Sequence, residues 1–211
     1  MIDSKTLIDS INSGCKSMFL KPFLLKKYPS HPNILTYRLE GNSNAINRFE
    51  YLSNELVKVL HWFSDFWIFI EIRFISNEIV EKRKKVSQTN ISISVSVFQG
   101  DDEKDMKYQL FRAEWDDFNN PEELHSQPHW HITSNQAIER TLLEYAVDFE
   151  KSDFVSMLEQ EKEKVFDVNK IHFAMNGNWQ NDQTNIHEIG DERKIVKWFR
   201  GMLKHIRTEL E

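Results

Sequence analysis

Hydrophobic and polar residues alternate strictly near the middle of the chain, where isoleucine and valine take turns with serine over residues 91–97. A period of two places the aliphatic side chains on one face of a β-strand and the serines on the other. We therefore expect a strand that packs its apolar face on the core and leaves its serine face in water. Similar or denser apolar patterns predict five further strands, at residues 34–40, 67–75, 106–115, 129–133 and 170–175. The strand at 67–75 is so rich in Phe and Ile that we expect it to be buried on both faces.

Elsewhere the apolar residues recur three and four positions apart, which is typical of amphipathic helices. The most regular stripe is at the C-terminal end, where Ile195, Phe199, Met202 and Ile206 share one helical face. The same spacing or helical composition predicts helices at residues 4–18, 45–63, 135–149, 153–165 and 191–210.

Together these elements predict an α+β fold, with an antiparallel or mixed β-sheet and amphipathic helices packed mainly on one side. The length of 211 residues fits one domain over 1–211, with a helical and apolar N-terminal segment at 1–30 and a C-terminal amphipathic helix at 191–211. Hydrophobic residues make up 40% of the chain, enough for a sizeable core, and 6 glycines and 5 prolines leave little material for long linkers.

Charge and cysteine content restrict the partners and the cellular compartment that we expect for this protein. A net charge of -6 gives no general attraction to nucleic acid, and the basic run Lys82 to Lys85 is typical of a solvated helix end. The single cysteine excludes an intramolecular disulfide framework and fits a reducing compartment. The N-terminus has no export-signal pattern and no apolar stretch is long enough for a membrane helix, so we expect a cytoplasmic protein without membrane association.

The candidate functional residues are polar side chains on three predicted strands. Alternation puts Arg112 and Glu114 on the same face of one strand, and it puts His129 and His131 together on another, about 6.6 Å apart along the chain. His172 lies on a third strand between two apolar residues, so sheet pairing would bring three histidines together. Three of the 8 histidines fall within residues 125–131, with His125 as a spare.

Two kinds of chemistry suit this set. His129, His131, His172 and Glu114 are the ligand types of a catalytic site for a divalent metal such as zinc or manganese. Without a metal, one histidine would act as general base and another as general acid, while Arg112 stabilises an anionic transition state. Both predict a hydrolase or nuclease-like enzyme that acts on a phosphoester, with nucleic acid entering only as a substrate. A third interpretation is structural, with the histidines satisfying backbone groups and Arg112 pairing with Glu114.

One short segment resembles a known signature. Trp130-His131-Ile132-Thr133 is similar to one half of the motif of two-histidine phosphoesterases, in which a hydrophobic residue, His, a hydrophobic residue and Thr or Ser occur twice. In the second frame, at 171–174, Ala174 stands where the hydroxyl residue should be, so the second half is missing.

The alternative function is a non-enzymatic protein-binding or regulatory module, an accessory or neutralising partner of another protein. Its contact surface would be the acidic loop that contains Asp116, Asp117, Glu122 and Glu123. This alternative predicts that the histidines do not converge. Independently, the apolar cluster at residues 19–25 must be buried against the domain itself or against another chain. We expect a homodimer to bury it.

Overall fold

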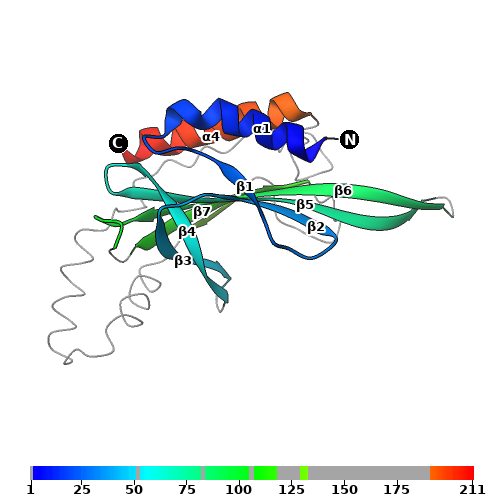
Figure 1. The fold of residues 1–211 in the computed structure, drawn as a ribbon, viewed down its shortest axis with the longest axis horizontal. Coiled ribbons are helices and arrows are strands. Elements are labelled where there is room, and N and C mark those ends of the chain that lie inside the picture. Colours follow the sequence, from blue (N-terminus) through cyan, green and yellow to red (C-terminus); the bar gives the residue numbers. More distant parts are fainter. Residues whose placement is uncertain (1, 51–52, 82–83, 105–106, 118–128, 133–190) are drawn as a thin grey trace.

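The computed structural model of the chain describes residues 2–50, 53–81, 84–104, 107–117, 129–132 and 191–211. Within these residues the protein is mostly antiparallel β-sheet (Figure 1). The eight strands are β1 (Leu25–Tyr28), β2 (Ile34–Leu39), β3 (Ser43–Glu50), β4 (Ser53–Phe63), β5 (Phe66–Glu81), β6 (Lys84–Gln99), β7 (Tyr108–Asp116) and β8 (His129–Ile132). The helices are α1 (Ser4–Cys15), the short 3-10 helix η1 (Lys16–Met18) and α4 (Glu192–Leu210).

The predicted α+β class, with its several amphipathic helices, is wrong: the described residues form a β-sheet with only two α-helices. The largest error is the helix predicted at 45–63, a segment that forms the β3–β4 hairpin. Val57 and Val59 are 3% and 0% exposed, whereas Leu56, which the helical stripe places in the core, is 69% exposed. Burial here has a period of two, so the helical spacing arose from apolar residues on both faces of a strand. The helices predicted at 135–149 and 153–165 and the strand at 170–175 lie outside the described residues.

The sheet is organised around its two long central strands. The strand order is β1-β2-β5-β6-β7-β8, while β4 pairs with the beginning of β5 and with β3. The β5–β6 pairing runs from Phe66↔Gln99 to Glu81↔Lys84, and this hairpin extends well beyond the rest of the sheet in Figure 1. Both faces of β5 are buried in its first half, at Ile68 and Ile70 on one side and at Trp67 on the other. The predicted burial of this strand on both faces is thus confirmed, as are the strands near 34–40, 91–97, 106–115 and 129–133.

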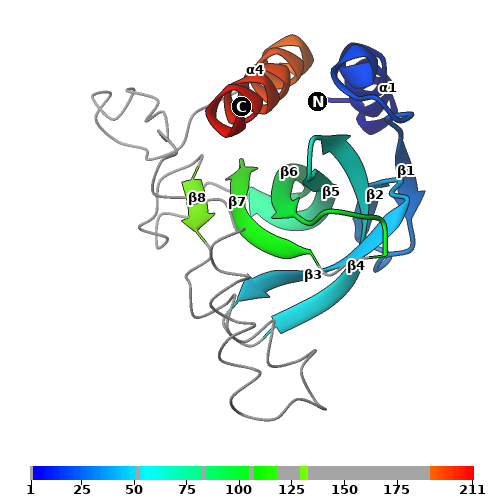
Figure 2. The same ribbon diagram turned by 90° about the vertical axis from the view of Figure 1, so that its left-hand side faces the viewer.

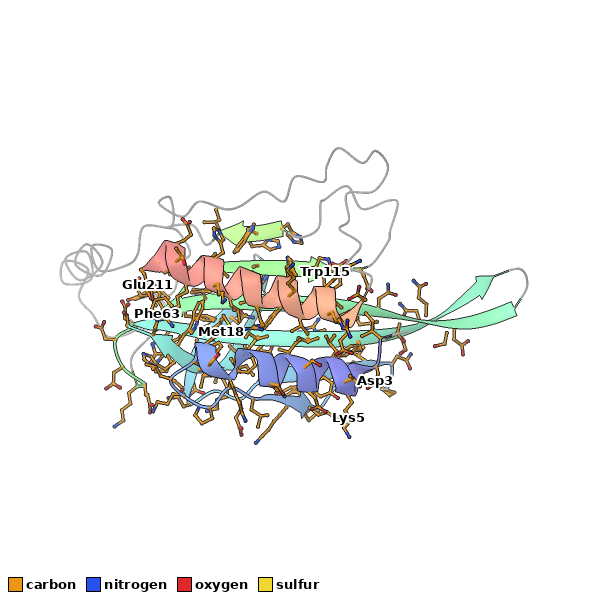
Figure 3. The ribbon with its side chains drawn as sticks, turned by 90° about the horizontal axis from the view of Figure 1, so that it is seen from above. Asp3, Lys5, Met18, Phe63, Trp115 and Glu211 are labelled. Atoms are coloured by element: carbon orange, nitrogen blue, oxygen red, sulfur yellow. The ribbon has the colours of Figure 1, made fainter. Side chains whose placement is uncertain are left out.

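One face of the sheet is covered by α1 and α4, which lie next to each other (Figure 2) and run in the same direction (Figure 3). The carboxylates of Asp3 and Asp191 cap the two helices by accepting hydrogen bonds from the backbone N–H groups of Thr6 and Lys194. The core between helices and sheet includes Leu7, Ile11, Ile195, Phe199, Leu203, Ile68, Ile70, Ile93, Val95, Phe111 and Trp115. The amphipathic pattern of the C-terminal segment therefore predicted both the helix and its buried face.

The other face of the sheet carries the β3–β4 hairpin, and this arrangement overturns the expectation of a wet serine face. Ser94 and Ser96 on β6 are only 7% and 0% exposed. The Ser96 hydroxyl donates a 2.7 Å hydrogen bond to Asn47 Oδ1 on β3. A small apolar cluster, formed by Ala45, Val57, Val59, Trp67, Phe69 and Phe98, fills the rest of the contact between hairpin and sheet. Serine fits here because its small side chain lets the hairpin approach closely.

The apolar N-terminal segment is largely covered by the chain itself. Phe19 and Phe23 are 9% and 2% exposed, and the Phe19 ring lies 5.9 Å from that of Trp62. Leu20 and Leu24 remain exposed, at 81% and 36%. The homodimer stays a prediction. The exposed apolar surface that would support it is smaller than the sequence indicated. No helix among the described residues is both long and apolar enough to cross a membrane.

Candidate functional site

The candidate site lies on β7 and β8, at the end of the sheet. Register pairs Arg112 with His131 and Glu114 with His129. Their neighbours Phe111, Ala113 and Trp115 point into the core beneath the helices, so alternation turns Arg112 and Glu114 to the opposite face. On β8, Trp130 packs on the Phe111 ring at 5.7 Å, which turns both histidines to the same face as Glu114.

The three side chains meet at a single point. The Nε2 atoms of His129 and His131 lie 3.4 Å and 2.9 Å from Oε2 of Glu114, and they lie 2.8 Å from each other. The imidazole rings stand nearly perpendicular, with centroids 4.7 Å apart. Of the described histidines, these two therefore present their ring nitrogens to the same carboxylate oxygen.

Arg112 engages the other side of that carboxylate. Its Nε lies 2.7 Å from Oε1 of Glu114, and its Nη1 donates a 2.5 Å hydrogen bond to the backbone oxygen of Arg48 on β3. With the residue only 4% exposed, the guanidinium is held between the hairpin and the sheet. The sequence suggested that Arg112 binds an anionic group. That role stays a prediction. In the structure Arg112 contacts both carboxylate oxygens of Glu114, because its Nη2 also donates a 3.4 Å hydrogen bond to Oε2, and it thereby orients the carboxylate toward the histidines.

The charge state of Glu114 follows from these neighbours. Partial burial alone would raise the pKa of Glu114. Hydrogen bonds from His129 and His131 and the positive charge of Arg112 outweigh that cost and hold the pKa well below its ordinary value. Glu114 is therefore a carboxylate at neutral pH, which is the form that can bind a cation.

This geometry can hold a metal ion. The candidate ligand atoms of Glu114, His129 and His131 all lie within 4.8 Å of one another. Zinc binds imidazole nitrogen and carboxylate oxygen at ~2.0–2.2 Å, so Glu114, His129 and His131 would be close enough together to hold one ion between them. His131 is exposed, and its side chain is 49% accessible. Solvent can therefore reach the site, as a catalytic metal centre with an open coordination position requires.

The structure thus brings together four of the residues singled out from the sequence: Arg112, Glu114, His129 and His131. His172 and the spare His125 lie outside the described residues, so their roles stay predictions. The contribution that sequence analysis missed is the Arg48 carbonyl oxygen, which fixes Arg112 from a strand 64 residues away. No local pattern signals such a contact.

Comparisons of the chain with protein-family models, with curated proteins and with solved structures gave no match.

Proposed function

We propose that this protein is a metal-dependent hydrolase whose divalent ion is bound by Glu114, His129 and His131. The observation that carries the proposal is the convergence of Glu114 Oε2 and two histidine Nε2 atoms, with separations of 2.8 to 3.4 Å. Two histidines and a carboxylate are an established ligand set for catalytic zinc and for non-haem iron.

Each residue has a definite part in this proposal. His129 and His131 supply neutral nitrogen ligands, and Glu114 supplies a negative oxygen ligand that partly balances the charge of the ion. Arg112 is a positioning residue, because it holds Oε1 of Glu114 and is itself anchored to the hairpin. A divalent ion in this site would activate a water molecule and bind an anionic phosphoryl oxygen, and a phosphoester is therefore the substrate class we propose.

The alternative, a protein-binding module without catalysis, is less well supported. It predicts histidines that do not converge, whereas His129 and His131 face the same carboxylate oxygen at hydrogen-bond distance. A purely structural pairing of Arg112 with Glu114 would not require two further imidazoles on that oxygen.

Hydrolysis of bis(p-nitrophenyl) phosphate by purified protein, with zinc or manganese added, tests the enzyme proposal. We expect metal-dependent turnover that is lost when a chelator is added and in the His131→Ala variant. The thermal midpoint of this variant should be close to that of the unmodified protein. His205→Ala is the matched control, because His205 lies on α4 near Glu209 and outside the site. Metal-independent turnover, or a His131→Ala protein that fails to fold, would contradict the proposal in favour of a metal-free or structural role.

A further inference from the structure

A groove runs between α1 and α4 on the helical side of the molecule. It has a volume of about 570 Å³ and is lined by Ser10 of α1 and by Glu192, Arg193, Val196, Lys197, Arg200, Gly201 and Lys204 of α4. Figure 3 shows the two helices running side by side above the sheet. This size is within the range of ligand-binding clefts.

The walls of the groove are strongly basic although the whole chain has a net charge of -6. Arg193, Lys197, Arg200 and Lys204 are all exposed, and their spacings of four, three and four residues place them on one face of α4. Glu192 is the one acidic residue in the lining, and its carboxylate already accepts a 2.6 Å hydrogen bond from Ser10.

These four cations differ from the other charged residues of α4. Lys194 pairs with Asp191 at 3.5 Å, and Arg207 pairs with Glu211 at 2.7 Å. By contrast, the structure records no ion pair or side-chain hydrogen bond for the four groove cations within the described part of the chain. Like charges three and four residues apart destabilise a helix, and an anion bound in the groove would relieve that repulsion.

We propose that the groove between α1 and α4 binds the phosphodiester backbone of nucleic acid. The four cations extend over twelve residues of helix, whose eleven steps span ~16 Å, which matches several successive phosphates of a strand better than one small anion. The described lining contains no aromatic side chain on which a base could stack, so the contacts are to phosphates and independent of base sequence. At Gly201 a side chain would meet no atom within 4 Å, so the middle of the groove is open.

This site is separate from the proposed metal centre. Trp198 of α4 packs against Trp115 of β7 at 6.0 Å on the helical side of the sheet, whereas Glu114 faces the opposite side. Binding of nucleic acid in the groove therefore does not depend on metal binding. Experiments can refute either proposal without affecting the other.

Fluorescence anisotropy with a labelled, mixed-sequence 20-nucleotide single-stranded DNA tests the inference on the full chain. We expect binding that weakens with salt, with a slope of about -3 in a plot of log K against log salt concentration, as four phosphate contacts require. The double variant Lys197→Glu/Arg200→Glu should weaken binding at least tenfold, and Lys197→Gln/Arg200→Gln should weaken it less. Neither variant should lower the thermal midpoint or weaken any metal binding, because both relieve the repulsion between the cations.

The control Lys58→Glu/Lys104→Glu makes the same change in net charge at exposed positions away from the two helices, and it should bind as the unmodified protein does. Equal loss in this control would show general electrostatic attraction and overturn the proposal. So would the absence of binding at low salt, or competition by polyglutamate as effective as competition by unlabelled DNA.

Discussion

Glu114 and His131 stand on neighbouring antiparallel strands with Oε2 and Nε2 2.9 Å apart, and His129 Nε2 lies 3.4 Å from the same oxygen. The contact depends on two structural features: alternation turns these side chains to one face, and Arg112 fixes the far oxygen of the carboxylate. The proposed metal site is therefore a property of the β7–β8 pair and of the hairpin that anchors it.

Val59 and Leu56 distinguish the observed hairpin from the helix that the sequence suggested. Val59 is fully buried, and Val59→Ala should lower the free energy of unfolding by about 1–3 kcal/mol, because it leaves a cavity. Leu56 is 69% exposed, and Leu56→Ala should change that free energy by less than about 0.5 kcal/mol. Urea denaturation of both variants measures the difference. A large cost at Leu56 would mean that this strand has the opposite face in the core.

Gly41 and Gly201 should respond to alanine in opposite directions. A Cβ at Gly41 would overlap the backbone of Val59, so Gly41→Ala should cost more than about 2 kcal/mol by forcing β4 to move. Gly201 lies within α4 and has open space around it, so Gly201→Ala should stabilise the protein by about 0.5–1 kcal/mol through helix propensity. Thermal and urea unfolding of the pair provide the measurement. Equal effects of the two substitutions would contradict the close approach at Gly41.

Cys15 should be unreactive in the folded protein. It is completely buried, and burial raises the pKa of its thiol to about 12, although Arg200 acts in the opposite direction. The thiolate is the reactive form of cysteine. Because pH 8 is far below the pKa of this thiol, almost no thiolate is present at that pH. Labelling with iodoacetamide at pH 8 should be much slower in buffer than in denaturant. Rapid labelling under native conditions would show that α1 detaches from the sheet.

Much of the fold was predictable from local patterns. Five of the six expected strands are present among the described residues, as are the helices near the two ends of the chain, such as the C-terminal helix around Phe199. The sixth expected strand, at 170–175, lies outside the described residues. The β3–β4 hairpin was not predictable in this way, because Leu56 and Val59 fit a helical stripe as well as a strand. The burial of Ser94 and Ser96 also depends on where that hairpin folds, which is a long-range property of the chain.

Part of the candidate site was also predictable from a local pattern in the sequence. Alternation along a strand placed Arg112 with Glu114 and His129 with His131, and the structure adds that the two strands are neighbours. The burial of Arg112 and its anchor on Arg48 required the tertiary structure. The basic face of α4 has a signal in the sequence, which is the spacing of its cations by three and four residues. Neither the net charge of the chain nor the basic run at 82–85 indicates it.

His172 lies outside the described residues, and its predicted role as a further ligand has its own test. If it binds the metal, His172→Ala should weaken zinc affinity at least tenfold without preventing folding. Calorimetric titration of this variant beside the unmodified protein measures the effect. An unchanged affinity would limit the protein ligands to Glu114, His129 and His131 among the predicted set.

Isothermal titration of the metal-free protein with zinc measures whether Glu114, His129 and His131 form a metal site. We expect one zinc ion to bind per chain. Binding should be lost in Glu114→Gln and in His129→Ala/His131→Ala, and it should be retained in His205→Ala. A metal site at these residues is excluded if the unmodified protein binds no zinc, or if zinc affinity persists in the folded His129→Ala/His131→Ala variant.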